Sequence, residues 1–182
     1  MIPTREDCLR LMVERGMLGN IFDHSLVVAR VALFLSVRLN RKGQRLDLSL
    51  VEAAALLHDL TKTECLRTKE DHALTGSRVL KEMGYHRLGE VVAAHIHLSK
   101  PMDPYRVSEE EVVNYADKRV RHDQIVSLEE RFEDLKGRYG MNERAIELLD
   151  ALKEATFAVE RKIFSFLEMD PDRLEAYLCE EQ

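Results

Sequence analysis

The segment at residues 53–62 reads AAALLHDLTK and predicts a buried helix that ends in polar groups. Alanine and leucine are strong helix formers, and this apolar run delivers the imidazole of His58 beside the carboxylate of Asp59. A buried charge is costly unless it is paired or holds a metal. A neutral nitrogen ligand next to an anionic oxygen ligand suits Zn, Mn or Fe(II) better than Ca. Adjacent helix residues point about 100° apart, so both side chains reach one ion only near a helix end. The alternative is a helix that happens to finish with a polar pair.

The composition limits the classes of protein to which the chain can belong. The chain has 182 residues, of which 45% are apolar and 33% charged, as in an ordinary globular domain. Its net charge of -6 argues against a general nucleic-acid binder. No apolar run approaches the roughly 20 residues that span a membrane, and residues 1–7 lack the apolar stretch of a signal peptide. The three cysteines show no CxxC spacing, which argues against a disulfide framework or a zinc knuckle. We therefore expect a cytoplasmic protein with no membrane partner.

Helical periodicity runs through almost the whole chain, and no stretch alternates as a strand. The expected helices begin at or near Thr4, Phe22, Asp47, Asp71, Arg87, Ser108, Ser127, Asn142 and Asp170. Residues 102–107, with Pro101 before them and Pro104 among them, are expected to form a loop beside the site. The prediction is an all-α fold, with residues 1–182 in a single domain.

Six candidate metal ligands lie on different expected helices or at their ends: His24, His58, Asp59, His72, His95 and Asp117. Helical bundles assemble metal sites in this way, from side chains that project inward from several helices. The first ion would be bound by His24, His58, Asp59 and Asp117. The second would be bound by His72 and His95, with Asp59 as a bridge. Two ions about 3.5–4 Å apart would clamp a phosphate and activate the attacking water.

Each histidine taken alone has a plainer interpretation. His24 could cap its helix or lie on the surface, and His72 could be solvated. His95 and His97 differ by two positions and cannot share one helix face. His95 follows an apolar run and is the favoured ligand, whereas His97 could face the substrate or solvent. His122, in a run of basic residues, is expected on a solvated face.

The ordered set His24, His58-Asp59 and Asp117 resembles the signature of the HD-domain superfamily of metal-dependent phosphohydrolases. The resemblance covers about residues 20–122 and implies an HD-domain helical bundle, with additional C-terminal helices at about 123–182. The run HDLTK at residues 58–62 resembles the HDxxK form, in which the lysine contacts phosphate or donates a proton. A lysine is a compact cation suited to phosphate. The alternative role for Lys62 is that of an exposed cation satisfying carbonyls at a helix end.

The other histidines indicate a subgroup. The segment HALTG at residues 72–76 resembles the "His…Gly" segment of two-metal HD proteins, and His95 takes the place of their next metal histidine. The pattern is closest to bacterial HD-type diadenosine tetraphosphate hydrolases. The HD-GYP cyclic-dinucleotide phosphodiesterases share the HDxxK form. Here, however, the histidine doublet is interrupted as His95-Ile96-His97, and residues 99–103 show no GYP segment.

The resemblance implies a metal-dependent phosphohydrolase that cleaves a phosphoester or phosphoanhydride bond of a small nucleotide-like substrate through a metal-activated water. Asp59 and Lys62 would be catalytic, and the substrate would contact Lys62, His97, Lys118 and Arg121. The cofactor would be one or two divalent transition-metal ions (Fe, Mn or Zn, with Mg or Ni able to replace them in vitro). The alternative is a non-catalytic HD-fold sensor or interaction module that binds metal or nucleotide. The long helix at residues 142–168 would pack over the core or form a homodimer.

Overall fold

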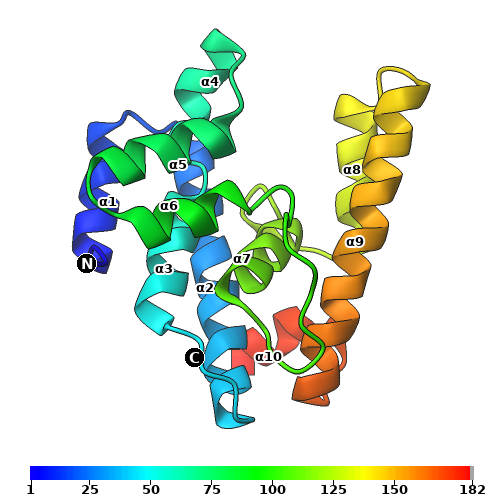
Figure 1. Ribbon diagram of the computed structural model, residues 1–182. Helices are drawn as coiled ribbons and strands as arrows, with labels where there is room; N and C mark the ends of the chain where they lie inside the picture. Colours follow the sequence, from blue (N-terminus) through cyan, green and yellow to red (C-terminus); the bar gives the residue numbers. More distant parts are fainter. Residues whose placement is uncertain (181–182) are drawn as a thin grey trace.

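The computed structural model describes residues 1–180 and is helical almost throughout, which confirms the expected all-α class (Figure 1). The helices are α1 (Arg5–Glu14), α2 (Gly19–Arg41), α3 (Leu48–Leu57), α4 (Lys62–Thr68), α5 (His72–Glu82), α6 (His86–Ala93), α7 (Glu109–Lys118), α8 (Leu128–Tyr139), α9 (Glu143–Leu167), the 3-10 helix η1 (Pro171–Arg173) and α10 (Leu174–Glu180). Two short strands, β1 (Val120–Arg121) and β2 (Gln124–Ile125), pair antiparallel between α7 and α8.

The helices start where the capping residues predict. The side chains of Thr4, Asp47, Ser108, Ser127 and Asn142 each accept a hydrogen bond from the backbone N–H three residues further along the chain. At Thr4, Ser108 and Ser127 the acidic side chain at that third position bonds back to the cap, completing a capping box. These local bonds explain why most helix starts can be read from the sequence.

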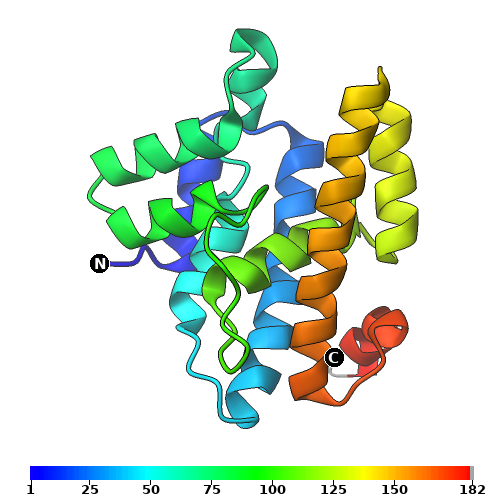
Figure 2. The same ribbon diagram turned by 45° about the vertical axis from the view of Figure 1, so that its right-hand side comes forward.

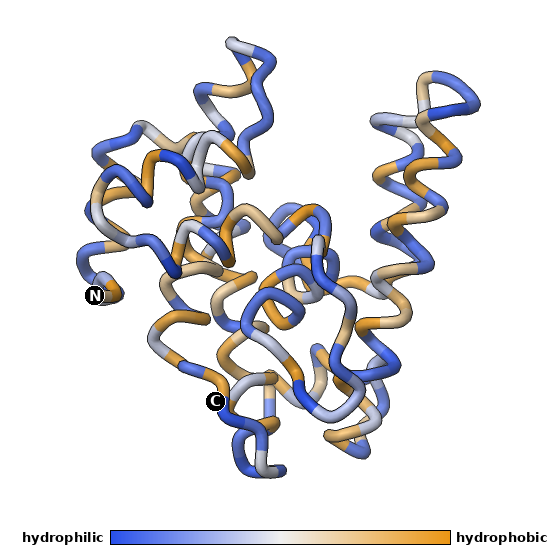
Figure 3. Tube along the Cα trace, viewed as in Figure 1, coloured by the Kyte–Doolittle hydropathy of each residue, from blue (hydrophilic) through white to orange (hydrophobic). Residues whose placement is uncertain are grey.

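The core is built around α2, which packs against α3, α7 and α9. By length and composition α2 could span a membrane, contrary to the expectation from the sequence, but 56% of its most apolar window is buried inside the protein. Figures 1 and 2 show α8 and the first half of α9 extending together beyond the body, and Figure 3 shows hydrophilic residues interspersed with hydrophobic ones along this pair. The apolar face of α2 is therefore used within the protein.

The pair α5 and α6 positions two of the candidate ligands. At Gly89 a Cβ atom would lie 2.8 Å from the backbone oxygen of Ser77, so only glycine allows α5 and α6 to pack this closely. The two helices form a hairpin, in which the start of α5 lies beside the end of α6. His72 and His95 are consequently brought to the same end of the pair.

The structure differs from the expected helices in three places. Helix α2 begins at Gly19 and not near Phe22, so His24 lies in its second turn. Lys62 begins the short helix α4 and does not lie at the end of α3, which finishes at Leu57. The sequence does not predict helix α4, because Cys65 is its one buried residue and its sequence therefore shows no apolar periodicity. The strands β1 and β2 have two residues each, too few for alternation to be visible.

Candidate metal centre

All six candidate ligands come together at the ends of five helices. His24 is supplied by α2, His72 opens α5, and Asp117 lies in the last turn of α7. His58 and Asp59 follow the end of α3, and His95 follows the end of α6. The turn after α3 is tied to the start of α5, because the Thr61 hydroxyl donates to the His72 carbonyl at 2.9 Å. Elements that are distant in sequence therefore converge on one cluster.

Asp117 joins the first group of ligands. Its Oδ1 lies 3.0 Å from His24 Nε2 and 3.5 Å from His58 Nε2. His58 Nε2 is also 3.4 Å from Asp59 Oδ2. The ligand atoms of His24, His58 and Asp59 lie within 4.8 Å of one another, close enough to bind one ion.

Asp59 also belongs to the second group. Its Oδ1 lies 3.2 Å from His72 Nε2 and 3.7 Å from His95 Nε2. The two imidazole nitrogens are 3.3 Å apart, and all three ligand atoms fit within 4.8 Å. One oxygen of Asp59 thus faces each group.

The orientation of the imidazoles favours metal binding. Nδ1 of His24, His58 and His95 lies 2.7–2.9 Å from a backbone carbonyl oxygen. A carbonyl can only accept a hydrogen bond, so each Nδ1 carries its hydrogen and each Nε2 is directed at the cluster. A backbone carbonyl on the far nitrogen is a frequent partner of a metal-binding histidine.

Two buried polar atoms at the centre of the cluster also indicate that it could hold a metal ion. His58 Nε2 and Asp59 Oδ1 are buried, yet neither makes a hydrogen bond of good geometry within residues 1–180. Buried polar atoms in native proteins are usually satisfied, so such exceptions need an explanation. Nitrogen and carboxylate donors around these two atoms could hold a divalent metal ion.

The electrostatics of the metal-free cluster centre on His58. Burial alone would lower the pKa of His58, but the carboxylates of Asp59 and Asp117 raise it to about 10. Burial opposes ionisation of both carboxyls, yet His58 and Lys62 hold the pKa of Asp59 well below its usual range, and Lys118 does so for Asp117. Burial, and then the charge of His58, lower the pKa of His95 to about 3. His95 is therefore neutral and ready to bind a metal, whereas His58 must first lose a proton.

This proton predicts how metal affinity depends on pH. Metal competes with the proton on His58, so we expect affinity to rise by up to about tenfold per pH unit, levelling off near pH 10. In the metal-free protein the sign is opposite. The pKa of His58 is raised from 6.5, so its contribution to stability is complete below pH 6.5 and is lost as the pH rises toward about 10. Titration of Zn²⁺ against a chromophoric chelator at pH 6, 7, 8 and 9 measures the first effect. An affinity that does not change with pH would contradict it.

The predicted substrate-binding residues differ in position. Lys62 donates to Asp59 Oδ2 at 2.7 Å and its side chain is 32% exposed, while that of His72 is 24% exposed, so solvent reaches the cluster on this side. Lys118 is buried and donates to Asp117 Oδ2 at 2.6 Å and to the His95 carbonyl at 3.1 Å. Its predicted contact with substrate stays a prediction, one that this buried position does not favour. Within residues 1–180, no hydrogen bond or ion pair joins the side chain of His97 or Arg121 to the cluster, and their roles also stay predictions.

Two residues that support the cluster are missed by sequence reasoning. The backbone carbonyl of His122 accepts from His24 Nδ1, and its ring accepts from Arg138 of α8 at 3.0 Å. His122 is exposed, as the sequence predicts, and it also supports His24. Its φ of 56° is a left-handed conformation that is unusual outside glycine. Asn114 Nδ2 lies 3.0–3.2 Å from the three successive carbonyl oxygens of residues 94–96 and so holds the segment that carries His95. An asparagine within the otherwise apolar run at residues 112–116 is the signal that could have indicated Asn114.

Comparisons with known proteins agree with this arrangement. The sequence model of the HD domain family matches residues 21–133, more than half of the chain. The tRNA (cytidine(56)-2′-O)-methyltransferase of Thermoplasma volcanium is 28% identical over 143 residues, which are 71% of this chain and 40% of that protein. This chain thus spans about two fifths of the length of that relative. The crystal structure of a predicted HD superfamily hydrolase from an uncultured Thermotogales bacterium matches with a TM-score of 0.51 and 17% identity, covering 90% of this chain and 93% of the other. This likeness shows a shared fold.

Proposed function

Since the chain belongs to the HD domain family, we propose that it is a metal-dependent phosphohydrolase that cleaves a phosphoester or phosphoanhydride bond of a small nucleotide-like molecule. The observation that carries the proposal is the position of Asp59, whose two carboxylate oxygens face two groups of imidazole nitrogens. A shared carboxylate between two ion sites is suited to phosphoryl chemistry, because paired ions clamp both the attacking and the leaving oxygen.

Different residues of the chain would have different roles in this reaction. When bound, divalent ions would supply Lewis-acid stabilisation and an activated water. Asp59 would set the separation of the two ion sites. Lys62, the most exposed cation in contact with Asp59, is the group best positioned to meet a phosphate. Buried Lys118 balances the charge of Asp117, so that this carboxylate stays ionised.

The methyltransferase relative favours a second candidate. That protein is named for methyl transfer to a tRNA, and this chain corresponds to 40% of its length. A segment of this kind within a longer enzyme could be a non-catalytic metal-binding or nucleotide-binding module. Methyl transfer to tRNA by this chain itself is not favoured, since its net charge is -6 and tRNA is a polyanion.

The test combines metal content with hydrolysis. Protein purified without chelator or His-tag is expected to bind one or two ions of Fe, Mn or Zn per chain. It is then assayed with diadenosine tetraphosphate, cyclic dinucleotides and nucleoside mono- and triphosphates, and released products are measured. Lys62→Met should keep the metal while turnover falls about 10²-fold or more, since an electrostatic contact with the transition state is lost. Lys69→Met, at the other end of α4 and exposed, is the matched control. A metal-loaded protein that hydrolyses nothing in the panel would contradict the proposal and favour the module.

A further inference from the structure

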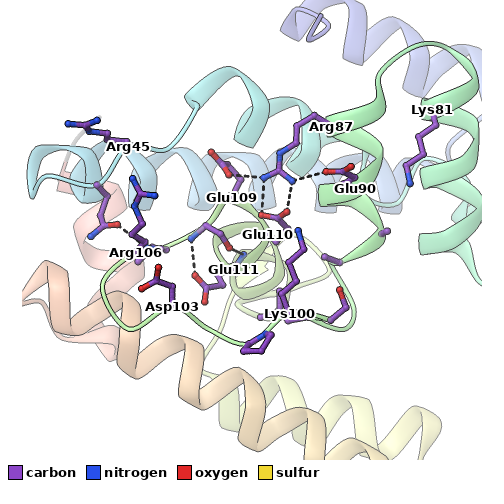
Figure 4. A pocket seen from close by; sticks show the side chains of 18 residues that line it. Arg45, Lys81, Arg87, Glu90, Lys100, Asp103, Arg106, Glu109, Glu110 and Glu111 are labelled. Atoms are coloured by element: carbon purple, nitrogen blue, oxygen red, sulfur yellow. Dashed lines mark hydrogen bonds and ion pairs between the residues drawn. The ribbon is translucent and has the colours of Figure 1, made fainter.

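A cavity of about 700 Å³ lies outside the metal cluster. It is bounded by the end of α6, the loop at residues 98–107, the first turn of α7 and the connection that follows α2 (Figure 4). Among the described residues that line it, none is one of the six candidate metal ligands. Its volume falls within the range of small-molecule sites, which is about 300–1,000 Å³.

The loop over this cavity is held in position by side-chain bonds. Gln44 Oε1 accepts from the backbone N–H of Val107 at 2.9 Å, and Gln44 Nε2 donates to the Tyr105 carbonyl at 3.4 Å. Gln44 itself lines the cavity. The cavity is therefore framed by an ordered loop that joins two walls of the fold.

The acidic residues of the cavity are largely neutralised. Arg87 makes ion pairs with Glu110 at 2.5 Å, Glu109 at 3.0 Å and Glu90 at 3.2 Å (Figure 4). Glu111 is paired with Lys162 at 2.6 Å, outside the lining. These contacts leave four of the five lining carboxylates anchored to protein cations, whereas the fifth, Asp103, accepts a hydrogen bond from the backbone N–H of Tyr105 at 2.8 Å and makes no ion pair within residues 1–180.

Two arginines that line the cavity differ from Arg87, because they are not paired with carboxylates. Arg45 and Arg106 line it and make no ion pair or side-chain hydrogen bond within residues 1–180. Figure 4 draws both at one end of the cavity, with the Arg87 cluster toward the other end. A guanidinium presents a planar fork of donors that matches phosphate oxygens. Part of the remaining wall is apolar, with Ala93, Leu98 and Pro101 among its residues, and the polar side chains of Lys81, Ser99 and Lys100 line the rest.

From this arrangement we propose that the cavity binds a nucleoside 5′-phosphate, with the phosphate between Arg45 and Arg106 and the base against the apolar wall. A nucleoside phosphate combines one compact anion with one flat, largely apolar ring, which is the division of chemistry that the lining offers. Anchored carboxylates at the far end accept hydrogen bonds from the amino groups of a base. Binding requires neither a metal nor hydrolysis, so it stands independently of the proposed function.

Occupancy of the cavity is transmitted to the metal cluster. Ala94 lines the cavity and precedes the candidate ligand His95. Asn114 and Lys118 both bond to the carbonyl of His95, so the segment has little freedom to absorb a displacement. A nucleotide that presses on Ala94 therefore acts on the second group of ligands, and the site is regulatory.

The experiment measures binding of AMP, GMP, CMP and UMP to the full metal-loaded chain by calorimetry. The variant Arg45→Ala/Arg106→Ala should bind at least about 100-fold more weakly, on the basis of about tenfold for each lost charge-assisted bond. Arg15→Ala/Arg41→Ala removes the same charge at exposed arginines outside the cavity and should bind as the wild type does. Unsubstituted nucleosides and inorganic phosphate alone should each bind more weakly than the nucleotide.

Further measurements distinguish binding in this cavity from binding at the metal cluster. Ala93→Phe fills the apolar side without changing charge and should also abolish binding, which keeps the test decisive if the double arginine variant fails to fold. With Co²⁺ in the metal site, nucleotide should change the visible absorption of the wild type but not of Ala93→Phe. Equal binding by all variants would mean that nucleotides bind at the metal ions, and would overturn the proposal. Absence of binding at millimolar nucleotide would overturn it as well.

Discussion

Replacing Asp59 with alanine will remove metal from both groups of ligands and lower hydrolytic turnover by at least about 10³-fold. The reason is that Asp59 serves both groups: its oxygens lie 3.4 Å from His58 Nε2, 3.2 Å from His72 Nε2 and 3.7 Å from His95 Nε2. Without this carboxylate the second group retains two imidazoles and no anionic ligand. Elemental analysis of the purified variant and its rate of phosphate release measure the two effects.

The variant is expected to stay folded, although Asp59 is buried. Removing Asp59 lowers the pKa of His58, and the carboxylate of Asp117, 3.5 Å from His58 Nε2, still compensates any charge that His58 keeps. The ammonium of Lys62 is partly exposed and can turn to solvent. Both partners thus avoid an unpaired buried charge. Asp23→Ala, an exposed aspartate next to His24, is the matched control and should keep its metal. Wild-type metal content in Asp59→Ala would refute the shared-ligand arrangement.

Replacing Glu160 with alanine will lower the free energy of unfolding by about 3–5 kcal/mol. The Glu160 carboxylate accepts from the Tyr115 hydroxyl at 2.6 Å and from Arg119 Nη1 at 3.3 Å. The Arg119 side chain is 3% exposed and cannot lose its proton, so removal of Glu160 leaves a buried, uncompensated cation. Arg119 cannot become neutral by losing its proton, whereas His58 in Asp59→Ala can. A typical domain has only about 5–15 kcal/mol of stability, so this loss is large.

Denaturant unfolding of three further variants tests the explanation. Glu160→Leu combined with Arg119→Met should recover much of the stability, because both charges are replaced by apolar groups of similar size. Lys42→Ala breaks the exposed pair with Glu168 and should change the free energy of unfolding by less than about 1 kcal/mol. A loss in Glu160→Ala as small as that in Lys42→Ala would show that the cluster around Arg119 is solvated.

The features that the sequence predicts well are those that depend on residues close together in the chain. Capping residues such as Asp47, Ser108 and Asn142 act on the N–H groups three positions away, so helix starts follow from neighbours in the chain. The candidate ligands are also recognisable locally, because His58, Asp59 and Asp117 each follow an apolar helical run. Their order along the chain also predicts that they converge on one site.

Long-range contacts explain what the sequence does not reveal. Lys118 and Arg119 are adjacent and similar, yet one neutralises Asp117 in the metal cluster and the other is tied to Glu160 of α9. Their directions depend on partners far along the chain. The role of His122 involves its backbone carbonyl, which has no signature in the sequence.

The separation of the ligands along the chain has a consequence for how the site is made during synthesis. His72 and His95 are 23 residues apart, whereas His24 and Asp117 are 93 apart. Short loops close at lower entropic cost and sooner than long ones. At about 5–20 residues per second, the ribosome adds the stretch from His95 to Asp117 in roughly one to four seconds. A nascent chain therefore carries every ligand of the Asp59–His72–His95 group before it carries Asp117, the last ligand of the other group.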